Sequence, residues 1–177
     1  MRNCLRRNAL VLALISGFIV VTANSARAEP WDEYSYSSDG FVISAPFAPA
    51  LSKADFGTPA NPLPSRILTW KFPDGAVVLV TATDYSGTDS VDASLNSVAQ
   101  GEVQSLKNGR IVSQKSLVQQ GVNGIECVME GDDYHARTRI FRQGNRIWNI
   151  YVLSSTGKPI YDQTDRLFAS FRFLQTP

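Results

Sequence analysis

Apolar and polar side chains alternate along much of this chain, and this period is typical of β-strands. Leu68, Trp70 and Phe72 follow the alternation, whereas the segment 76–83 is apolar on both faces over residues 77–80 and predicts a central strand. Turn-forming residues, such as Asp39-Gly40, separate the segments and predict antiparallel hairpins. The predicted strands cover residues 34–37, 41–44, 67–72, 76–83, 110–119, 125–130, 134–142 and 146–155.

The period changes to that of an α-helix in two places. The first helix is predicted to follow a cap at Asp89 or Ser90 and to end at Asn108-Gly109, and the second to begin near Pro159. The residues at helical spacing are Val91, Leu95, Val98, Glu102, Val103 and Leu106 in the first helix, and Ile160, Thr164, Leu167, Phe168 and Phe171 in the second. This order of elements predicts an α+β fold, in which two principal helices cover one face of a central antiparallel sheet of about six to seven strands.

Five prolines fall within residues 46–64, where large apolar side chains are rare. Proline fixes φ and cannot donate a backbone hydrogen bond, so this segment is predicted to be a long surface loop and not an element of the fold. Structureless loops of this length are uncommon in compact domains. The segment is therefore either a docking segment or a plain connector.

The hairpin around residues 125–140 allows its strand register to be predicted. If Asp132-Asp133 forms a two-residue turn, one face of the hairpin is apolar and includes Cys127, and the other pairs opposite charges across the strands. The facing pairs are then Glu130 with His135, Val128 with Arg137, Glu126 with Arg139, Met129 with Ala136, Cys127 with Thr138 and Ile125 with Ile140. A slip of one residue would mix the two sets, so the pattern favours this register.

The polar face of this hairpin is the candidate ligand site. A three-residue turn at 143–145 would send Trp148, Ile150 and Val152 inward and place Asn149 and Tyr151 beside the arginines. The candidate ligand-binding residues are therefore His135, Arg137, Arg139, Asn149 and Tyr151. Two guanidinium groups on one face can grip a carboxylate or phosphate. The alternative is an ordinary solvent face, on which Glu126 and Glu130 already neutralise the arginines.

The first 28 residues have the three regions of a secretory signal peptide. A basic segment with three arginines precedes the apolar run of residues 9–23, and Ala26-Arg27-Ala28 then offers small residues at a cleavage site. The alternative is an uncleaved anchor, but the run is shorter than the ~18 apolar residues that a spanning helix needs. Cys4 precedes the run, so a lipoprotein is not expected. We expect a soluble periplasmic protein with one domain over residues 29–177.

The charge and the cysteine content of that domain narrow its class. Loss of residues 1–28 leaves 13 basic and 16 acidic side chains, a net charge of −3. This charge argues against nucleic-acid partners and against binding to anionic membranes, and we expect no stable membrane insertion after cleavage. Cys127 is the one remaining cysteine, so no disulfide can form within the chain, and pairing with another chain stays open.

Residue types that carry common chemistry are scarce in this domain. Cys127 and His135 are too few for a structural zinc site, and the predicted register places them on opposite faces of the sheet. The sequence contains no Gly-x-Ser-x-Gly elbow and no phosphate-binding glycine loop. Residues 84–92 offer spaced oxygen ligands, but Asp89 stands where a calcium loop requires glycine. We therefore expect no catalytic residues, no metal and no cofactor.

Packing motifs near both ends of the domain carry a resemblance to a known family. They are Trp31, the hairpin over residues 34–41 with Gly40-Phe41-x-Ile43-x-x-Pro46, and the closing Arg166-Leu167-Phe168-Ala169-Ser170-Phe171. With this element order the chain resembles the PsbP-like fold family, whose bacterial members include exported domains of unknown function and DcrB-like proteins. The resemblance implies a central antiparallel sheet between helices and mostly non-catalytic roles in binding or assembly. It supplies no catalytic residues and does not imply a role in photosynthesis.

Three functional hypotheses follow. The first is a non-catalytic periplasmic interaction or assembly module that docks on an envelope protein. The second is a small-anion-binding protein that uses the outward face of the central hairpin. The third and most distant is a hydrolase without a recognisable motif.

Overall fold

Ten strands and two α-helices make up the part of the chain that the computed structural model describes, namely residues 30–86, 94–158 and 160–174. In chain order they are β1 (Asp32–Tyr36), β2 (Phe41–Ala45), β3 (Ala50–Asp55), β4 (Pro64–Lys71), β5 (Val77–Asp84), α1 (Leu95–Gln104), β6 (Arg110–Gln119), β7 (Val122–Glu130), β8 (Tyr134–Gln143), β9 (Arg146–Ser155), α2 (Thr164–Ser170) and β10 (Arg172–Phe173). A 3₁₀ turn, η1 (Ser37–Asp39), joins β1 to β2. The strands predicted from the alternating pattern are all confirmed, with bounds that differ by a few residues.

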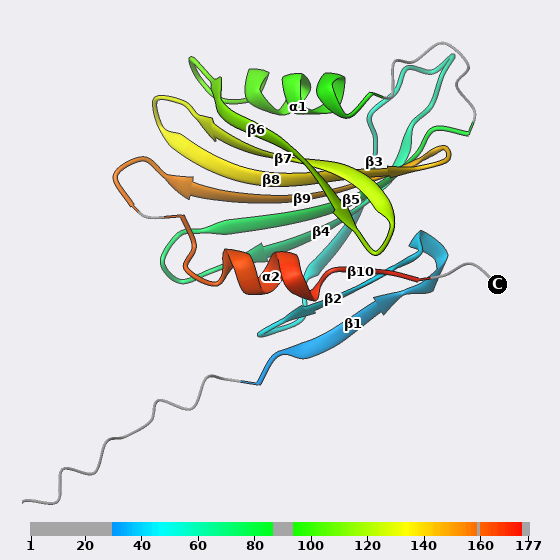
Figure 1. Ribbon diagram of the computed structural model, residues 1–177, viewed down its shortest axis with the longest axis horizontal. Coiled ribbons are helices and arrows are strands. Elements are labelled where there is room, and N and C mark those ends of the chain that lie inside the picture. The colour runs from blue at the N-terminus through cyan, green and yellow to red at the C-terminus, as the bar shows by residue number, and fades with distance from the viewer. Residues whose placement is uncertain (1–29, 87–93, 159, 175–177) are drawn as a thin grey trace, which may run out of the picture.

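The elements form three layers (Figure 1). The middle layer is a seven-stranded antiparallel sheet of order β3-β4-β5-β9-β8-β7-β6. Helix α1 covers one face, and α2 covers the other together with a three-stranded sheet of order β1-β2-β10. The α+β class is confirmed, as is the sheet between helices that the resemblance implied. The prediction that both helices lie on one face is wrong.

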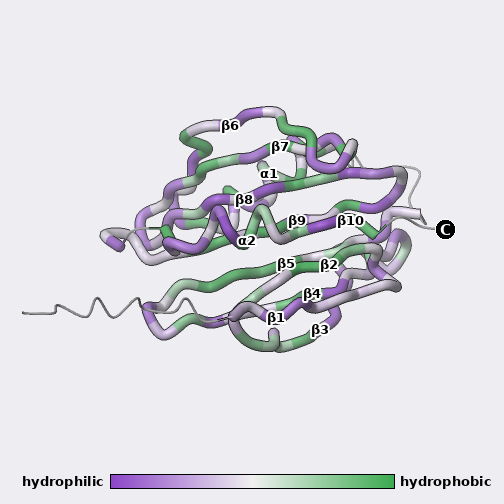
Figure 2. Tube along the Cα trace, turned by 60° about the horizontal axis from the view of Figure 1, so that its bottom comes forward, coloured by the Kyte–Doolittle hydropathy of each residue, from purple (hydrophilic) through white to green (hydrophobic). Residues whose placement is uncertain are grey.

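Each face of the large sheet has its own hydrophobic core, which is why both faces need a covering layer. The core on the α2 side includes Phe41, Leu68, Trp70, Val78, Val80, Ile150, Val152, Phe168 and Phe171. The core on the α1 side includes Ala99, Val103, Leu106, Cys127, Met129, Ala136, Ile140, Ile147 and Tyr151. Strand β5 contributes to both, and Figure 2 shows it hydrophobic over most of its length. The predicted central position of this strand is confirmed.

The segment from residue 46 to residue 64 is not the structureless loop that its prolines suggested. It contains β3, which pairs with β4 along its whole length at the edge of the large sheet. All five prolines lie outside β3, and Pro64 is the first residue of β4. An edge strand is held by backbone hydrogen bonds and buries few side chains, so its sequence gives little alternation.

The two helices begin later than their predicted starts. Ser94 caps α1 by accepting a hydrogen bond from the Ser97 amide, while the predicted caps at 89 and 90 lie outside the described residues. Helix α2 begins at Thr164, and the predicted start at residue 159 also lies outside them. Neither helix is long and apolar enough to span a membrane, a statement that covers residues 30–86, 94–158 and 160–174.

The two ends of the domain pack against each other. Strand β10, which the sequence pattern did not predict, pairs with β2, and the rings of Phe41 and Phe171 stack with centroids 5.3 Å apart. The Ser170 hydroxyl accepts from the Ser44 amide at 3.1 Å and donates to the Ser44 carbonyl at 3.2 Å. The motifs that carry the PsbP-like resemblance thus form one joint.

Gly124 lies inside β7, whereas the sequence predicted that this strand begins at residue 125. The turn before β7 is Gln120-Gly121, and both of its residues have positive φ. A Cβ atom at Gly124 would lie 2.5 Å from Cδ1 of Phe141 and 2.7 Å from the Ile140 carbonyl oxygen. Strand β7 therefore requires glycine here for close packing against β8.

We expect Gly124→Ala to lower the free energy of unfolding by about 1–3 kcal/mol, because the buried Phe141 ring must shift. The matched control is Gly101→Ala in α1, where a Cβ atom would meet no atom within 4 Å. That change is expected to raise stability by about 0.5–1 kcal/mol, as alanine is the better helix former. Urea denaturation of both variants measures the two effects, and equal shifts of the same sign would contradict the prediction.

Candidate functional site

The predicted register of the β7–β8 hairpin is confirmed for every facing pair. It places His135, Arg137 and Arg139 together on the α2 side of the sheet. Cys127 is buried on the opposite side, where its thiol donates to Oε1 of Gln114 at 3.6 Å. A cysteine–histidine pair is therefore ruled out, because the sheet separates the two side chains.

Asn149 and Tyr151 do not join the arginines, so the placement predicted for them is wrong. The turn between β8 and β9 has two residues, Gly144-Asn145, and not three, since Gln143 pairs with Arg146. This difference of one residue moves every side chain of β9 to the other face. As a result Ile150 faces Arg139, while Tyr151 faces Thr138 on the α1 side.

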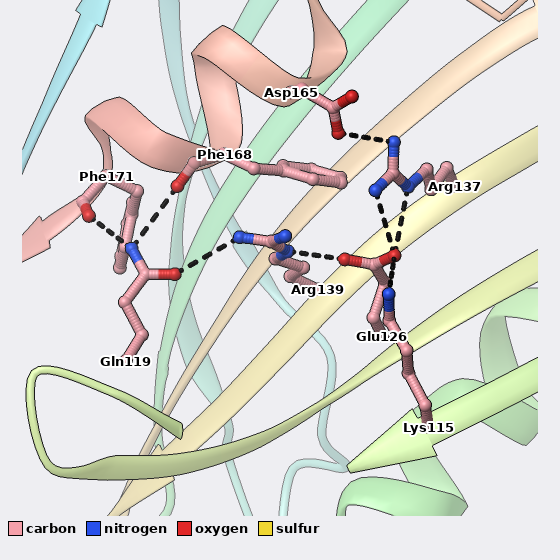
Figure 3. A network of polar contacts seen from close by, with 8 residues as sticks. All are labelled: Lys115, Gln119, Glu126, Arg137, Arg139, Asp165, Phe168 and Phe171. Carbon is pink, nitrogen blue, oxygen red and sulfur yellow. Dashed lines mark hydrogen bonds and ion pairs between the residues drawn. The ribbon is translucent and has the colours of Figure 1, made fainter. Parts of the chain in front are cut away.

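A buried carboxylate holds the two arginines (Figure 3). Glu126 is 5% exposed, and its Oε1 accepts from Nε and Nη2 of Arg137 at 3.1 and 2.9 Å. Its Oε2 accepts from Nε of Arg139 at 2.7 Å, and Nζ of Lys115 lies 3.1 Å from Oε1. The acid that was expected to neutralise the arginines in solvent is enclosed by three cations.

The same arginines connect the sheet to α2. Nη1 of Arg137 donates to Oδ1 of Asp165 at 2.7 Å, and both guanidinium groups lie over the Phe168 ring, 5.2 and 4.7 Å from its centroid. Nη1 of Arg139 donates to Gln119, whose amide nitrogen in turn donates to the carbonyls of Phe168 and Phe171. Figure 3 shows this network reaching from β6 to the end of α2. The guanidinium groups therefore serve internal partners, and little of their donor capacity faces an incoming anion.

The electrostatics of Glu126 reflect this enclosure. Burial by itself raises the pKa of the carboxyl group, but the hydrogen bonds from Arg139, Lys115 and Arg137 together outweigh burial and lower the pKa to about 2. The carboxylate is thus ionised at any physiological pH. A buried charge of this kind is stable only while all its partners stay in place.

Asn149 and Tyr151 open into a cavity of about 430 Å³ between α1 and the sheet. Three residues of α1 and its C-cap residue form one wall at helical spacing: Val98, Gly101, Glu102 and Ser105. The remaining lining residues are Phe56, Leu79, Thr81, Thr83, Tyr85, Ile147, Asn149 and Tyr151. This lining is mostly apolar with a few convergent polar groups, which is the usual composition of a small-molecule site.

Glu102 is the polar centre of this cavity, and the sequence analysis did not identify it as a site residue. Oγ1 of Thr138 donates to Oδ1 of Asn149 at 2.6 Å, and Nδ2 of Asn149 donates to Oε1 of Glu102. Oε2 of Glu102 and the hydroxyl of Tyr151 are buried without a hydrogen-bond partner among the described residues. The sequence carried one signal of this site, because Glu102 is an acidic residue at a position of the apolar stripe of α1.

Burial raises the pKa of Glu102 to about 8, and Asn149 and Thr138 oppose this effect by a smaller amount. The carboxyl group is therefore mostly protonated at neutral pH. Burial and the nearby Glu102 likewise raise the pKa of Tyr151 to about 12 and that of Cys127 to about 11. All three groups are largely uncharged at pH 7.

No group of three or more His, Cys, Asp or Glu side chains is arranged to hold a metal ion within residues 30–86, 94–158 and 160–174. Most of the acidic segment considered for calcium lies outside those ranges. Oδ1 of Asp84, at its start, accepts from the Ser86 amide at 2.8 Å. This contact is the turn-stabilising use of aspartate.

Comparison with solved structures identifies the fold. The chain is similar to the solution structure of cyanobacterial PsbP (CyanoP) from Synechocystis sp. PCC 6803, with a TM-score of 0.54 and 9% identity, over 87% of this chain and 98% of that one. It is also similar to the crystal structure of a protein of unknown function from Pseudomonas aeruginosa, with a TM-score of 0.40 and 12% identity, over 78% and 90% of the two chains. No family model and no curated protein sequence matches it. The chain therefore has a PsbP-like fold.

We expect Glu126→Gln to destabilise the protein at pH 7 by about 2–3 kcal/mol, because it leaves the buried guanidinium groups without their carboxylate. The pKa of Glu126 is depressed in the folded state, so its contribution is present above the unfolded pKa and is lost as pH falls from about 4.5 through about 2. Urea denaturation between pH 7 and pH 2 should show less acid destabilisation in the variant. Parallel curves for the two proteins would contradict the assignment.

Glu102→Gln is expected to act in a different pH range and with the opposite sign. Because the folded pKa of Glu102 is raised, the wild-type protein should lose stability as pH rises from about 4.5 through about 8, by up to about 4 kcal/mol. The variant carries no titrating group there, so it should match wild type near pH 5 and exceed it at pH 8. Urea denaturation of both proteins between pH 4.5 and pH 8 tests this, and a wild-type stability that is flat over this range would refute it.

Proposed function

We propose that this chain is a non-catalytic interaction module of the bacterial envelope, which docks an extended segment of a partner protein along the free edge of β3. Its PsbP-like fold and the lack of a nucleophile–base pair at Cys127 and His135 support a binding role. The signal-like segment at residues 1–28 supports export, and with it a partner outside the inner membrane.

The observation that carries the proposal is the exposure of β3 and its flanks. The strand has one neighbour, β4, so its other edge presents backbone groups that pair with no described strand. Five of its six residues are exposed, including Leu51 at 57%. Phe47 and Phe56, which flank the strand, are 40% and 57% exposed. Free backbone groups beside apolar side chains suit the addition of a partner strand, with pockets for alternate side chains.

The opposite edge of the large sheet is a poorer docking edge. Strand β6 carries exposed Val112 and Val118, but it has a bulge between Ile111 and Ser113. Bulges twist an edge away from further pairing. The pairing of β3 with β4 has no such shift, and Lys53 is the single basic side chain on β3. The regular edge of β3 is therefore better suited to pair with a partner strand than the bulged edge of β6.

Anion binding by the hairpin face has weaker support. Arg137 and Arg139 donate to Glu126, Asp165 and Gln119, so an anion would have to displace internal partners. Asn149 and Tyr151, the other members of that candidate site, lie across the sheet. For a hydrolase role, the described part of the chain offers no nucleophile–base pair at Cys127 and His135, which lie on opposite faces of the sheet.

A photocrosslinking amino acid at Ser52 in β3 tests the proposal, with Ser116 in β6 as the matched exposed control. In cells that export the protein, we expect a discrete crosslinked product from position 52 and none from position 116. Leu51→Lys should abolish this product while Val118→Lys leaves it, and both exposed substitutions should change stability by no more than about 0.5 kcal/mol.

Two outcomes would overturn the proposal. One is the absence of a product at position 52. The other is a product that forms equally at both positions or survives Leu51→Lys, because neither depends on the edge of β3.

A further inference from the structure

The cavity between α1 and the sheet contains the carboxyl group of Glu102, which no basic side chain of the described lining neutralises. Among its described lining residues Glu102 is the one carboxylic acid, and none is a lysine, arginine or histidine. A buried carboxyl group in such surroundings either remains protonated or acquires a cation. Burial raises the pKa of Glu102 to about 8, and no basic side chain is among the described lining residues to oppose this effect.

We propose that this cavity binds an organic amine, with the apolar body of the ligand against α1 and β9 and its ammonium group paired with Glu102. This site shares Phe56 with the flank of β3 but includes no residue of that strand or of the arginine network, and it does not depend on the proposed function. The ligand class follows from the geometry of the carboxyl group and the composition of the wall.

The carboxyl group is held in place for such a pairing. Asn149 donates to Oε1 of Glu102 and is itself oriented by Thr138, so the Oε2 atom is left available. The hydroxyl of Tyr151, also without a partner among the described residues, lies on the same cavity wall. An ammonium group needs acceptors: Oε2 of Glu102 accepts once the carboxyl group is ionised, and the oxygen of the Tyr151 hydroxyl can accept as well.

The remainder of the cavity suits the apolar body of an amine. A volume of about 430 Å³ lies within the range of small-molecule sites. Leu79, Val98 and Ile147 provide aliphatic contacts, and the rings of Phe56 and Tyr85 provide faces that attract a cation. Gly101 lines the helix wall, and a Cβ atom there would meet no atom within 4 Å, so the helix leaves room on this side.

The neighbouring titratable groups do not obscure the ionisation of Glu102. Tyr85 follows β5, Tyr151 lies on β9 and Cys127 lies on β7, and burial raises the pKa of each of them. They remain largely neutral between pH 6 and pH 9. A simple alkylamine, like lysine, stays protonated up to about pH 10. Over this range the pH response of amine binding therefore reports on Glu102.

Calorimetric titration of the purified protein with octylamine, and with octan-1-ol as the neutral analogue, tests the inference. The affinity for octylamine should rise about tenfold per pH unit from pH 6 toward pH 8, as the ionised fraction of Glu102 does below its pKa. The alcohol should bind more weakly at pH 8 and show no such rise. Glu102→Gln should remove the pH response and weaken octylamine binding at least tenfold at pH 8.

Two control variants separate the site from general effects. Glu130→Gln removes an exposed carboxylate outside the cavity and should leave both affinities unchanged. Gly101→Leu should weaken both ligands without unfolding the protein, because leucine favours helix and fills open space. Octan-1-ol that binds as tightly as octylamine at pH 8, a pH response that persists in Glu102→Gln, or no binding of either ligand would overturn the proposal.

Discussion

The layer that contains α2 depends on one buried carboxylate. Glu126 on β7 accepts hydrogen bonds from two arginines of β8, Arg137 and Arg139. Arg137 also donates to Asp165 on α2. Taking the carboxylate out of water is costly, but three cationic donors more than offset that cost, since the pKa of Glu126 is about 2. The arginines in turn lie over Phe168, so charge pairing and aromatic packing fix the same helix. Side chains that looked available for a ligand are thereby part of the scaffold.

The two turns of the β7–β8–β9 meander show what the sequence could and could not predict. The β7–β8 register followed from the sequence because a slip of one residue would mix the apolar set of side chains with the charged set. Strand β9 offers no such test, since Ile147, Trp148, Ile150, Tyr151 and Val152 are buried on one face or the other. Either register would bury large side chains, so the length of the turn alone decides which register β9 adopts. Gly144 adopts the positive φ that a two-residue turn uses.

The elements that the sequence did not predict are those that bury little. Strand β3 is almost entirely exposed, and β10 has two residues, so neither imposes a hydrophobic period on its segment. The polar centre of the cavity was hidden for a related reason. Glu102 occupies one position of an apolar helical stripe, and its contact with Asn149 becomes visible only in the folded structure. The pattern of apolar residues along a chain indicates which side chains are buried. It indicates which buried side chains contact each other only at positions where charges or turn residues fix the strand register.

The joint between the two ends of the domain bears on the order in which this protein folds. Ser44 and Ser170 are 126 residues apart, yet they exchange hydrogen bonds, and Phe41 stacks on Phe171. Contacts over such long stretches of chain form late, because the loop between them must first be closed. The hairpin of β1 and β2 contacts β4 and β9 through Asp39, which pairs with Arg66 and accepts from Trp148, but its contacts with α2 and β10 need the last described elements of the chain. The core on the α2 side is thus completed only when the first and last described elements of the chain have met.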